Sequence, residues 1–188
     1  EMRIVARLML EDGLTDPAEL ATYVQEHNAF QYPTERMLKS IAKACARRIA
    51  SVSDDPAITQ RLTQLIAQGT ADQLRQANLY AMMCDNRLVW EFMLNVVADK
   101  QRRLDRSLHA YEIASFIEGL RAQSEAVDSW SGATRNKIRQ VLTKCIEECG
   151  MYNRKEEELL PILADFELSQ IIRANGDGRA LAAFGMAE

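Results

Sequence analysis

The segment "SWSGATRNKIRQVLTKCIEECGMY", residues 129–152, carries four basic side chains and no acidic one between Thr134 and Lys144. Its apolar residues recur at i, i+3 and i+4, the spacing of one face of an α-helix. This spacing predicts a helix over residues 134–149, opened by a Ser-x-x-Thr sequence and closed by Gly150. The predicted buried face consists of Ile138, Leu142, Cys145, Ile146 and Cys149.

The opposite face of this helix is rich in long hydrogen-bond donors and amides. It holds Asn136, Lys137, Gln140, Thr143 and Lys144, and Arg139 lies on one flank. Arg and Lys pair with phosphates or guanine, while Asn and Gln make paired hydrogen bonds to adenine. The same residue types are common on ordinary surfaces. A DNA-reading face and a solvated face therefore both stay open.

The segment that follows, Met151-Tyr152 and then "NRKEEELLP", is able to turn back as a short β wing. A basic helix, a glycine stop and a hairpin occur in this order in winged helix-turn-helix proteins. The sequence leaves residues 151–160 open between a β-hairpin and a loop. We expect a winged helix-turn-helix-like C-terminal part with a short β wing.

The rest of the chain also shows helical periodicity, and strand-like alternation is almost absent. The fold class is therefore all-α, a compact multi-helix protein. Asp16-Pro17, Thr34-Glu35 and Asp55-Pro56 are typical helix starts. The further predicted helices span residues 2–10, 17–26, 34–52, 56–68, 71–83, 86–104 and 107–127.

The predicted domain organisation follows the chain in four steps. These are an N-terminal helical subdomain (1–70), central helices (71–127), a winged-helix-like segment (128–175) and a loosely held tail (176–188). No internal repeat or low-complexity tract is present.

Charges are segregated along the chain, although the net charge is only −4. Residues 11–30 hold five acids and no base, whereas residues 34–48 hold five bases and one acid, a difference of +4. At about 100° per residue, Arg36, Lys43 and Arg47 share one stripe of a helix, opposite Leu38, Ile41, Cys45 and Ile49. The stripe indicates either a nucleic-acid contact or a solvated face that complements the preceding acidic segment.

Composition and motifs exclude several classes of protein. With 188 residues, 47% hydrophobic and 27% charged, the chain can form a core, and its apolar runs are too short to cross a membrane. A cytoplasmic location is expected. Phosphate-binding loops, zinc-protease motifs and nucleophile elbows are missing, so no catalytic residues are predicted.

The four cysteines fit reduced, buried thiols. Cys145 and Cys149 lie four apart on one helix face, but no histidine pair accompanies them, so we expect neither a metal nor another cofactor.

Four blocks of this sequence, in order and with comparable spacing, resemble the BrxA family of bacterial BREX phage-defence loci. They are "EMRIVARLML", "EHNAFQYPTERMLKSIAKACARRI", "RLVWEFMLNVVADKQRRL" and "WSGATRNKIRQVLTKCIEECGMY", and the likeness runs to about residue 172. The resemblance implies a small, mainly helical, non-enzymatic component that binds double-stranded DNA. It also implies that the protein works beside the methyltransferase, the ATPase and other proteins of the locus. The family has no catalytic motif to transfer.

Two functions of different classes remain at the level of sequence. The first is double-stranded DNA binding, mainly to phosphates, through the residues of the two basic helices. The candidate contacts are Asn136, Lys137, Arg139, Gln140, Lys144, Arg36, Lys43 and Arg47, with help from Lys100, Arg102, Arg103 and Arg106. The second is a protein-interaction adaptor that docks other BREX components without touching DNA.

Overall fold

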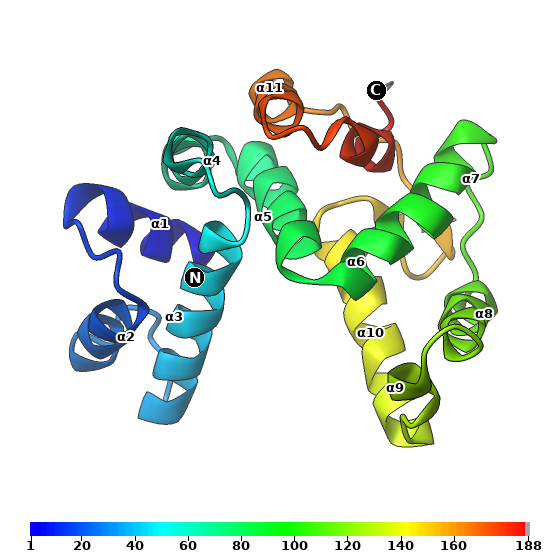
Figure 1. Ribbon diagram of the computed structural model, residues 1–188, viewed down its shortest axis with the longest axis horizontal. Coiled ribbons are helices and arrows are strands. Elements are labelled where there is room, and N and C mark those ends of the chain that lie inside the picture. Colours follow the sequence, from blue (N-terminus) through cyan, green and yellow to red (C-terminus); the bar gives the residue numbers. More distant parts are fainter. Residues whose placement is uncertain (187–188) are drawn as a thin grey trace. The chain divides into compact units, whose positions relative to one another are not determined.

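The computed structural model describes residues 1–186 and divides them into two units by compactness. The first unit contains residues 1–86 and 165–177, and the second contains residues 87–164 and the chain from Gly178 onward. Figure 1 shows that both units are built mainly of helices. The all-α prediction is confirmed. The four consecutive segments expected from the sequence divide the chain differently and stay a prediction.

The first unit consists of six helices. They are α1 (Met2–Glu11), α2 (Pro17–Glu26), α3 (Glu35–Ala50), α4 (Pro56–Gln68), α5 (Ala71–Asp85) and α11 (Phe166–Ala174). The side chain of Asp16 accepts hydrogen bonds from the amides of Ala18 and Glu19, and Asp55 accepts one from Ala57. These caps satisfy amides that a helix leaves unpaired at its start, and they confirm the helix starts predicted from Asp-Pro pairs.

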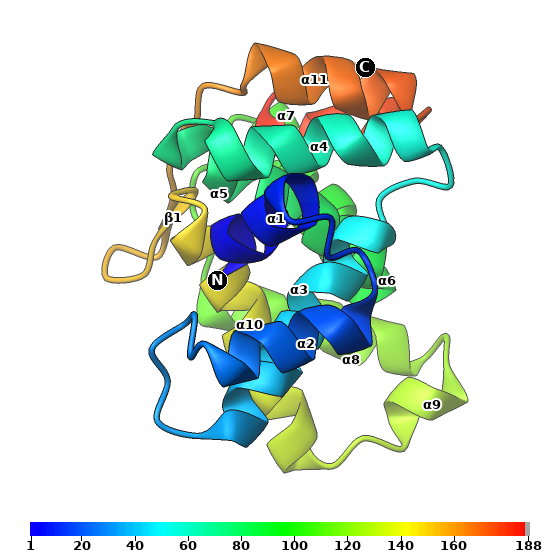
Figure 2. The ribbon, with the colours of Figure 1, turned by 90° about the vertical axis from the view of Figure 1, so that its left-hand side faces the viewer.

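Helix α11 lies beside α4 in both ribbon views and was not predicted from the sequence (Figure 2). It buries Leu168, Ile171 and Ile172, a pattern of only nine residues that is too short to stand out. Polar contacts attach the chain at both ends of α11 to α5. At the start, the amide of Asp165 donates to Gln76 Oε1 (2.9 Å), and after the end the Tyr80 hydroxyl donates to Asp177 Oδ2 (2.6 Å).

The second unit begins with a long helical stretch that is interrupted by a π-helix. It runs through α6 (Arg87–Phe92), the π-helix η1 (Met93–Val97) and α7 (Ala98–Arg102). The sequence predicted one uninterrupted helix over residues 86–104. Phe92, Met93 and Val97 are buried, so the apolar cluster of this stretch belongs to the core.

The remaining elements of the second unit are α8 (Ala110–Arg121), α9 (Glu125–Asp128), α10 (Gly132–Glu148), β1 (Tyr152–Asn153), β2 (Glu158–Leu159) and the 3-10 helix η2 (Gly178–Phe184). The predicted helix over residues 107–127 is thus two helices. In η2, Ala180, Leu181 and Phe184 are buried, so the expectation of a loosely held tail is wrong for residues 178–184. Residues 187–188, which that expectation included, lie outside the described part.

Candidate nucleic-acid interface

Helix α10 has the cap and the stop that the sequence indicates, although it begins two residues early, at Gly132. The hydroxyl of Ser131 accepts a hydrogen bond from the amide of Thr134 (3.1 Å). At the other end Gly150 has a φ of +78°, a conformation that glycine adopts without steric cost. The amide of Met151 then donates to the carbonyl of Ile146 (2.9 Å). These contacts fix the length of the helix and direct the chain into the hairpin.

The two faces of α10 are largely those predicted. Asn136, Lys137, Gln140 and Lys144 are exposed, and Arg139 is half-buried. On the other side Leu142, Cys145, Ile146 and Cys149 are buried, while Ile138 is half-buried. Thr143 differs from the prediction, because it is buried; its hydroxyl is satisfied there by donating to the carbonyl of Arg139 (2.9 Å), four residues back.

The candidate residues of α10 differ in how strongly other groups of the protein engage them. Lys137 makes no ion pair with any of residues 1–186. Lys144 Nζ lies 3.3 Å from Glu148 Oε1, and both side chains are largely exposed. Arg139 donates to Asn136 Oδ1 (2.7 Å). An exposed ion pair of this kind is worth little, so Lys137 and Lys144 are both able to reach a ligand.

A hairpin follows α10, which resolves the choice between hairpin and loop. Its strands are antiparallel, with Tyr152 opposite Leu159 and Asn153 opposite Glu158, and Ser107 forms an isolated bridge to Glu158. The turn is closed by Asn153 Oδ1, which accepts from the amide of Lys155 (3.0 Å). A short β wing is therefore present.

The hairpin is anchored to the start of α8 by Glu157, a residue with positive φ (51°). Its carboxylate contacts His109 Nδ1 (2.8 Å) and accepts from the amide of Ala110 (3.2 Å). The hydrogen bond with His109, followed by the one from Ala110, holds the pKa of Glu157 below its usual range. Tyr152 contributes from the other strand, since its hydroxyl donates to the carbonyl of Leu108 (2.9 Å).

An open hollow of about 370 Å³ lies between the exposed face of α10 and the hairpin. Lys137, Gln140 and Lys144 line it together with Arg154 of the turn. Glu147 and Glu148 line it as well, at the end of the helix. Arg154 was not among the predicted site residues. Its only sequence signal is its position in the expected wing.

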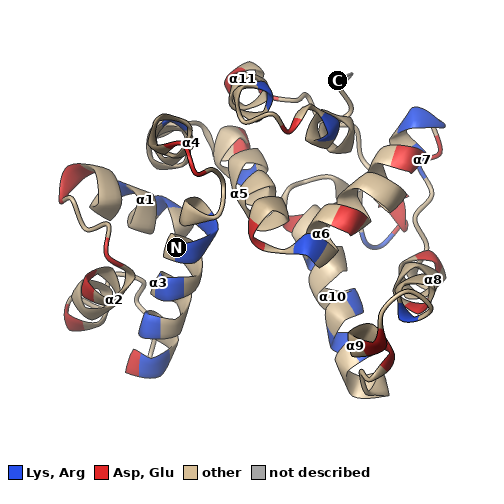
Figure 3. Ribbon diagram, viewed as in Figure 1, with Lys and Arg blue, Asp and Glu red and all other residues tan. Residues whose placement is uncertain are grey.

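The second predicted surface, the stripe on α3, lies in the first unit. Figure 3 shows basic residues along α3 and acidic residues on α2. Arg36 and Lys43 are exposed and pair with no carboxylate among the described residues. Arg47 instead makes two hydrogen bonds to Asp85, from Nε (2.8 Å) and from a terminal nitrogen (2.9 Å). No ion pair within the described part of the chain joins α3 to the acidic residues 11–30.

The auxiliary cations of residues 100–106 are engaged within the protein. Lys100 is buried between Asp105 and Glu112, each 2.7 Å from its Nζ, so it is not available to DNA and is removed from the candidates. The hydrogen bond from Lys100 lowers the pKa of Asp105 to about 2. Arg102 and Arg103 both lie beside Asp99, and Arg106 lies 3.0 Å from Glu158.

Neither a metal-binding cluster nor a membrane-spanning helix occurs within residues 1–186. Cys145 and Cys149 are buried free thiols, and within residues 1–186 no three His, Cys, Asp or Glu side chains converge on a point that suits a metal ion. Across the same residues, no helix has both the length and the apolar character needed to cross a bilayer.

The family model named BrxA matches residues 1–176 of this chain. The chain belongs to the BrxA family. The resemblance carried by the four sequence blocks is thereby confirmed. Family membership covers both units, because the matched residues include all the helices from α1 to α11.

Relatives of known name agree with this membership. "BREX protein BrxA" of Bacillus cereus is 31% identical over 180 residues, which cover 95% of this chain and 86% of that protein. "BREX protein BrxA" of Escherichia coli is 27% identical over 152 residues, covering 80% and 67%. The crystal structure of an uncharacterized protein from Magnetospirillum magneticum has a TM-score of 0.78 at 21% identity, covering 97% of this chain and 90% of that one. At that identity the likeness extends to the fold alone.

Proposed function

We propose that the chain is a double-stranded DNA-binding component of a BREX bacteriophage-defence system and acts in the cytoplasm. The printed name of its relatives, BREX protein BrxA, supports the BREX assignment. As the family resemblance implies, its role is binding without catalysis, beside the methyltransferase, the ATPase and other BREX proteins.

The observation that carries the DNA-binding proposal is the exposed basic and amide face of α10, followed directly by the β1–β2 hairpin. Helix α8, the short helix α9, helix α10 and the hairpin follow one another along the chain. In winged helix-turn-helix proteins the recognition helix, which enters the major groove, likewise precedes a hairpin. An α-helix fits that groove, which is about 12 Å wide. Arg154 in the hairpin turn adds a cation beside the helix.

The charges on α10 indicate which part of the helix faces DNA. Lys137 and Lys144 offer phosphate contacts, whereas Glu147 and Glu148 in the last turn repel phosphates. Asn136 and Gln140 are the residues with amides for base edges, but the Asn136 oxygen is already occupied by Arg139. We therefore expect binding through the part of α10 that ends at Lys144, dominated by phosphates and with modest sequence preference.

The first prediction tests this helix. A labelled duplex of about 20 base pairs is titrated by fluorescence anisotropy over a salt series, with wild type and Lys137→Glu/Lys144→Glu. We expect the double variant to lose affinity by at least several-fold and to flatten the log-log salt slope by about two, since each phosphate contact contributes about 0.9.

The matched control is Arg61→Glu/Arg87→Glu, two exposed cations outside α10 that undergo the same charge change. An equal loss of affinity in the control would mean that the change in net charge, and not the position on α10, weakens DNA binding. Unchanged binding by the α10 variant would remove this helix from the proposed interface.

The alternative function is a protein-interaction adaptor that docks other BREX components without DNA. It is favoured by the ion pairs in which carboxylates of the protein engage Arg47, Arg102 and Arg103. Pull-downs of the purified methyltransferase and ATPase with wild type and with Lys137→Glu/Lys144→Glu address it directly. Absent DNA binding at low salt, together with capture that the variant loses, would establish the adaptor role.

A further inference from the structure

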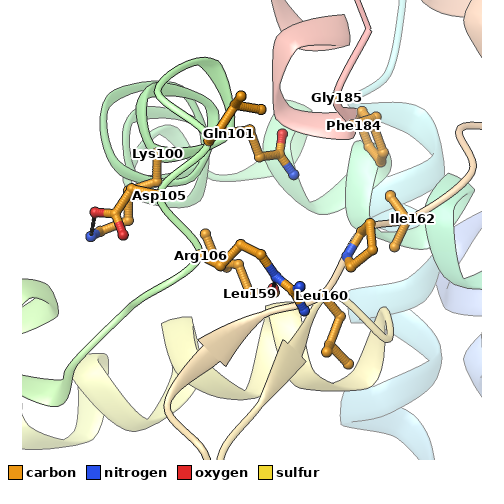
Figure 4. A pocket seen from close by; sticks show the side chains of 11 residues that line it. Lys100, Gln101, Asp105, Arg106, Leu159, Leu160, Ile162, Phe184 and Gly185 are labelled. Atoms are coloured by element: carbon orange, nitrogen blue, oxygen red, sulfur yellow. Dashed lines mark hydrogen bonds and ion pairs between the residues drawn. The ribbon is translucent and has the colours of Figure 1, made fainter.

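Two concave sites of the second unit differ in how their cations are paired. A cavity of about 270 Å³ lies between the end of α7, the extended stretch after β2 and the helix η2 (Figure 4). At this cavity Lys100 Nζ lies 2.7 Å from Asp105 Oδ2. Arg106 Nε lies 3.0 Å from Glu158 Oε1, so both cations contact carboxylates. The hollow beside α10 differs, because Lys137 pairs there with no carboxylate among residues 1–186.

The other two cations of the hollow contact two carboxylates from the last turn of α10. Glu148 Oε1 lies 3.3 Å from Lys144 Nζ. Glu147 Oε2 lies 4.0 Å from a terminal guanidinium nitrogen of Arg154 in the hairpin turn. The four side chains are 40–70% exposed. Exposed ion pairs contribute little to stability, so a phosphate oxygen is able to replace each carboxylate.

Helix stability does not account for two acidic residues at this end of α10. The carboxyl end of a helix carries partial negative charge, so acidic side chains are unfavourable there. No basic residue lies in the last turn of α10 to compensate them. In the pair of Lys144 with Glu148 the base precedes the acid, which is the less stabilising order at this spacing. The effect of the two carboxylates on Lys144 and Arg154 explains their position better than the folding of the helix does.

We propose that Glu147 and Glu148 bind Arg154 and Lys144 in the free protein and release them to the DNA backbone by exchange, which lowers the affinity for duplex DNA. This inference rests on the proposed DNA-binding function. Lys137 makes the first phosphate contact, because it needs no exchange and lies about 10.5 Å from Lys144 along the helix axis. At the other two cations a phosphate oxygen replaces a carboxylate oxygen. The gain from each of these contacts is only the difference between two charge-assisted pairs.

The test measures the affinity of Glu147→Gln/Glu148→Gln for a labelled duplex of about 20 base pairs by fluorescence anisotropy at low salt. We expect binding about three- to tenfold tighter than that of wild type, because both cations are then available without exchange. The matched control, Asp72→Asn/Glu91→Gln, removes two carboxylates that pair with arginines outside α10 and the hairpin. An equal gain in the control would assign the effect to net charge and overturn the proposal.

A second background separates exchange from direct repulsion between the carboxylates and DNA. In Lys144→Gln/Arg154→Gln the cations are absent, so only repulsion remains. Adding Glu147→Gln/Glu148→Gln to this background should therefore tighten binding by less than about twofold. A gain as large as that in the wild-type background would refute exchange. The thermal midpoint of Glu147→Gln/Glu148→Gln should equal or exceed that of wild type, and a fall would show that the two ion pairs serve the fold instead.

The same titrations distinguish failure of this inference from failure of the proposed function. Suppose that wild type binds the duplex and Lys137→Glu/Lys144→Glu weakens that binding, but Glu147→Gln/Glu148→Gln gives no gain. The exchange is then wrong, and the proposed function stands. Absence of binding by both wild type and Glu147→Gln/Glu148→Gln would overturn both proposals. Binding by Glu147→Gln/Glu148→Gln in the absence of binding by wild type would support the exchange.

Discussion

At the scale of single residues, Arg47 illustrates how a surface position acquires a structural role. Its guanidinium binds the carboxylate of Asp85 through two hydrogen bonds, and Ser51 donates a further, longer one at 3.3 Å. The hydrogen bonds from Arg47 hold the pKa of Asp85 below its usual range, against the opposing effect of burial. Arg47 therefore links α3 to the end of α5, and this structural role makes it a weaker candidate for DNA contact.

The second prediction concerns this pair. Asp85→Asn should lower the free energy of unfolding by about 1 kcal/mol at pH 7, since one partner is largely exposed. A carboxyl whose folded pKa is depressed stabilises above its unfolded pKa, about 3.9, and the contribution is lost as the pH falls through the folded value. Urea unfolding at pH 7 and below pH 3.9 should show that the difference in unfolding free energy between wild type and Asp85→Asn becomes smaller as the pH falls. Glu148→Gln, in an exposed pair with Lys144, should change little at either pH.

At the scale of elements, two arginines of α1 terminate α4. Arg3 donates from Nε to the carbonyl of Ile66 (3.3 Å) and from a terminal nitrogen to that of Gly69 (2.7 Å), and Arg7 donates to that of Ala67 (3.2 Å). The last carbonyls of a helix have no partners within it, and cations near that end are favourable. The two helices are thereby joined by polar contacts as well as by packing.

The third prediction is that Arg3→Met lowers the free energy of unfolding by about 1–2 kcal/mol, because it removes the side-chain donor from the carbonyls of Ile66 and Gly69. For a chain of this size each kcal/mol corresponds to about 2–4 °C in the thermal midpoint. Differential scanning calorimetry checks this. Arg61→Met, an exposed arginine on α4 itself, serves as the control, and an equal loss there would contradict the capping role.

The fourth prediction concerns the buried face of α10. Ile138 is only half-buried, so an aspartate there would reach water, whereas Ile146 is completely buried. Ile146→Asp should destabilise the second unit by more than about 3 kcal/mol, because it places an unpaired charge in the core. Hydrogen exchange should rise throughout residues 87–164. A normal exchange pattern in this variant would mean that α10 does not contribute to the core of its unit.

At the scale of the whole molecule, the fifth prediction asks whether the first unit also contacts DNA. Because Arg47 is held by Asp85, the informative variant is Arg36→Glu/Lys43→Glu, whose cations are free among the described residues. If both units contact one duplex, this variant and Lys137→Glu/Lys144→Glu should each weaken binding, and the combined variant should lose roughly the sum of the two free energies.

The same anisotropy titrations decide the result. Loss of affinity in the α3 variant alone would move the interface to the first unit. Loss of affinity in the α10 variant alone would mean that the α3 stripe is a solvated face that does not contact DNA. The thermal midpoint of each variant, measured beside the titrations, separates a lost contact from a lost fold.

Most of the helices, several of their starts and the exposed face of α10 could be predicted from the sequence, whereas α11 and the breaks within residues 86–104 and 107–127 were missed. They depend on local signals, such as Asp16 and Asp55 before proline, Gly150 after α10, and apolar residues three and four positions apart. Thr143 was predicted to be exposed because it is polar, but its hydroxyl is satisfied within the helix by the carbonyl of Arg139, so its burial leaves no donor unpaired. Family membership could also be predicted from the sequence, because the four sequence blocks occur in the family's order along the chain.

Only the tertiary structure decided which groups meet across long sequence separations. Examples are Tyr80 with Asp177, which are 97 positions apart, and His109 with Glu157, which are 48 apart. Which cations stay free and whether residues 151–160 form a hairpin both depend on such contacts. Local propensity specifies the helices because each one satisfies its own backbone. Pairings between distant residues depend on packing and desolvation summed over the fold, which no short stretch encodes.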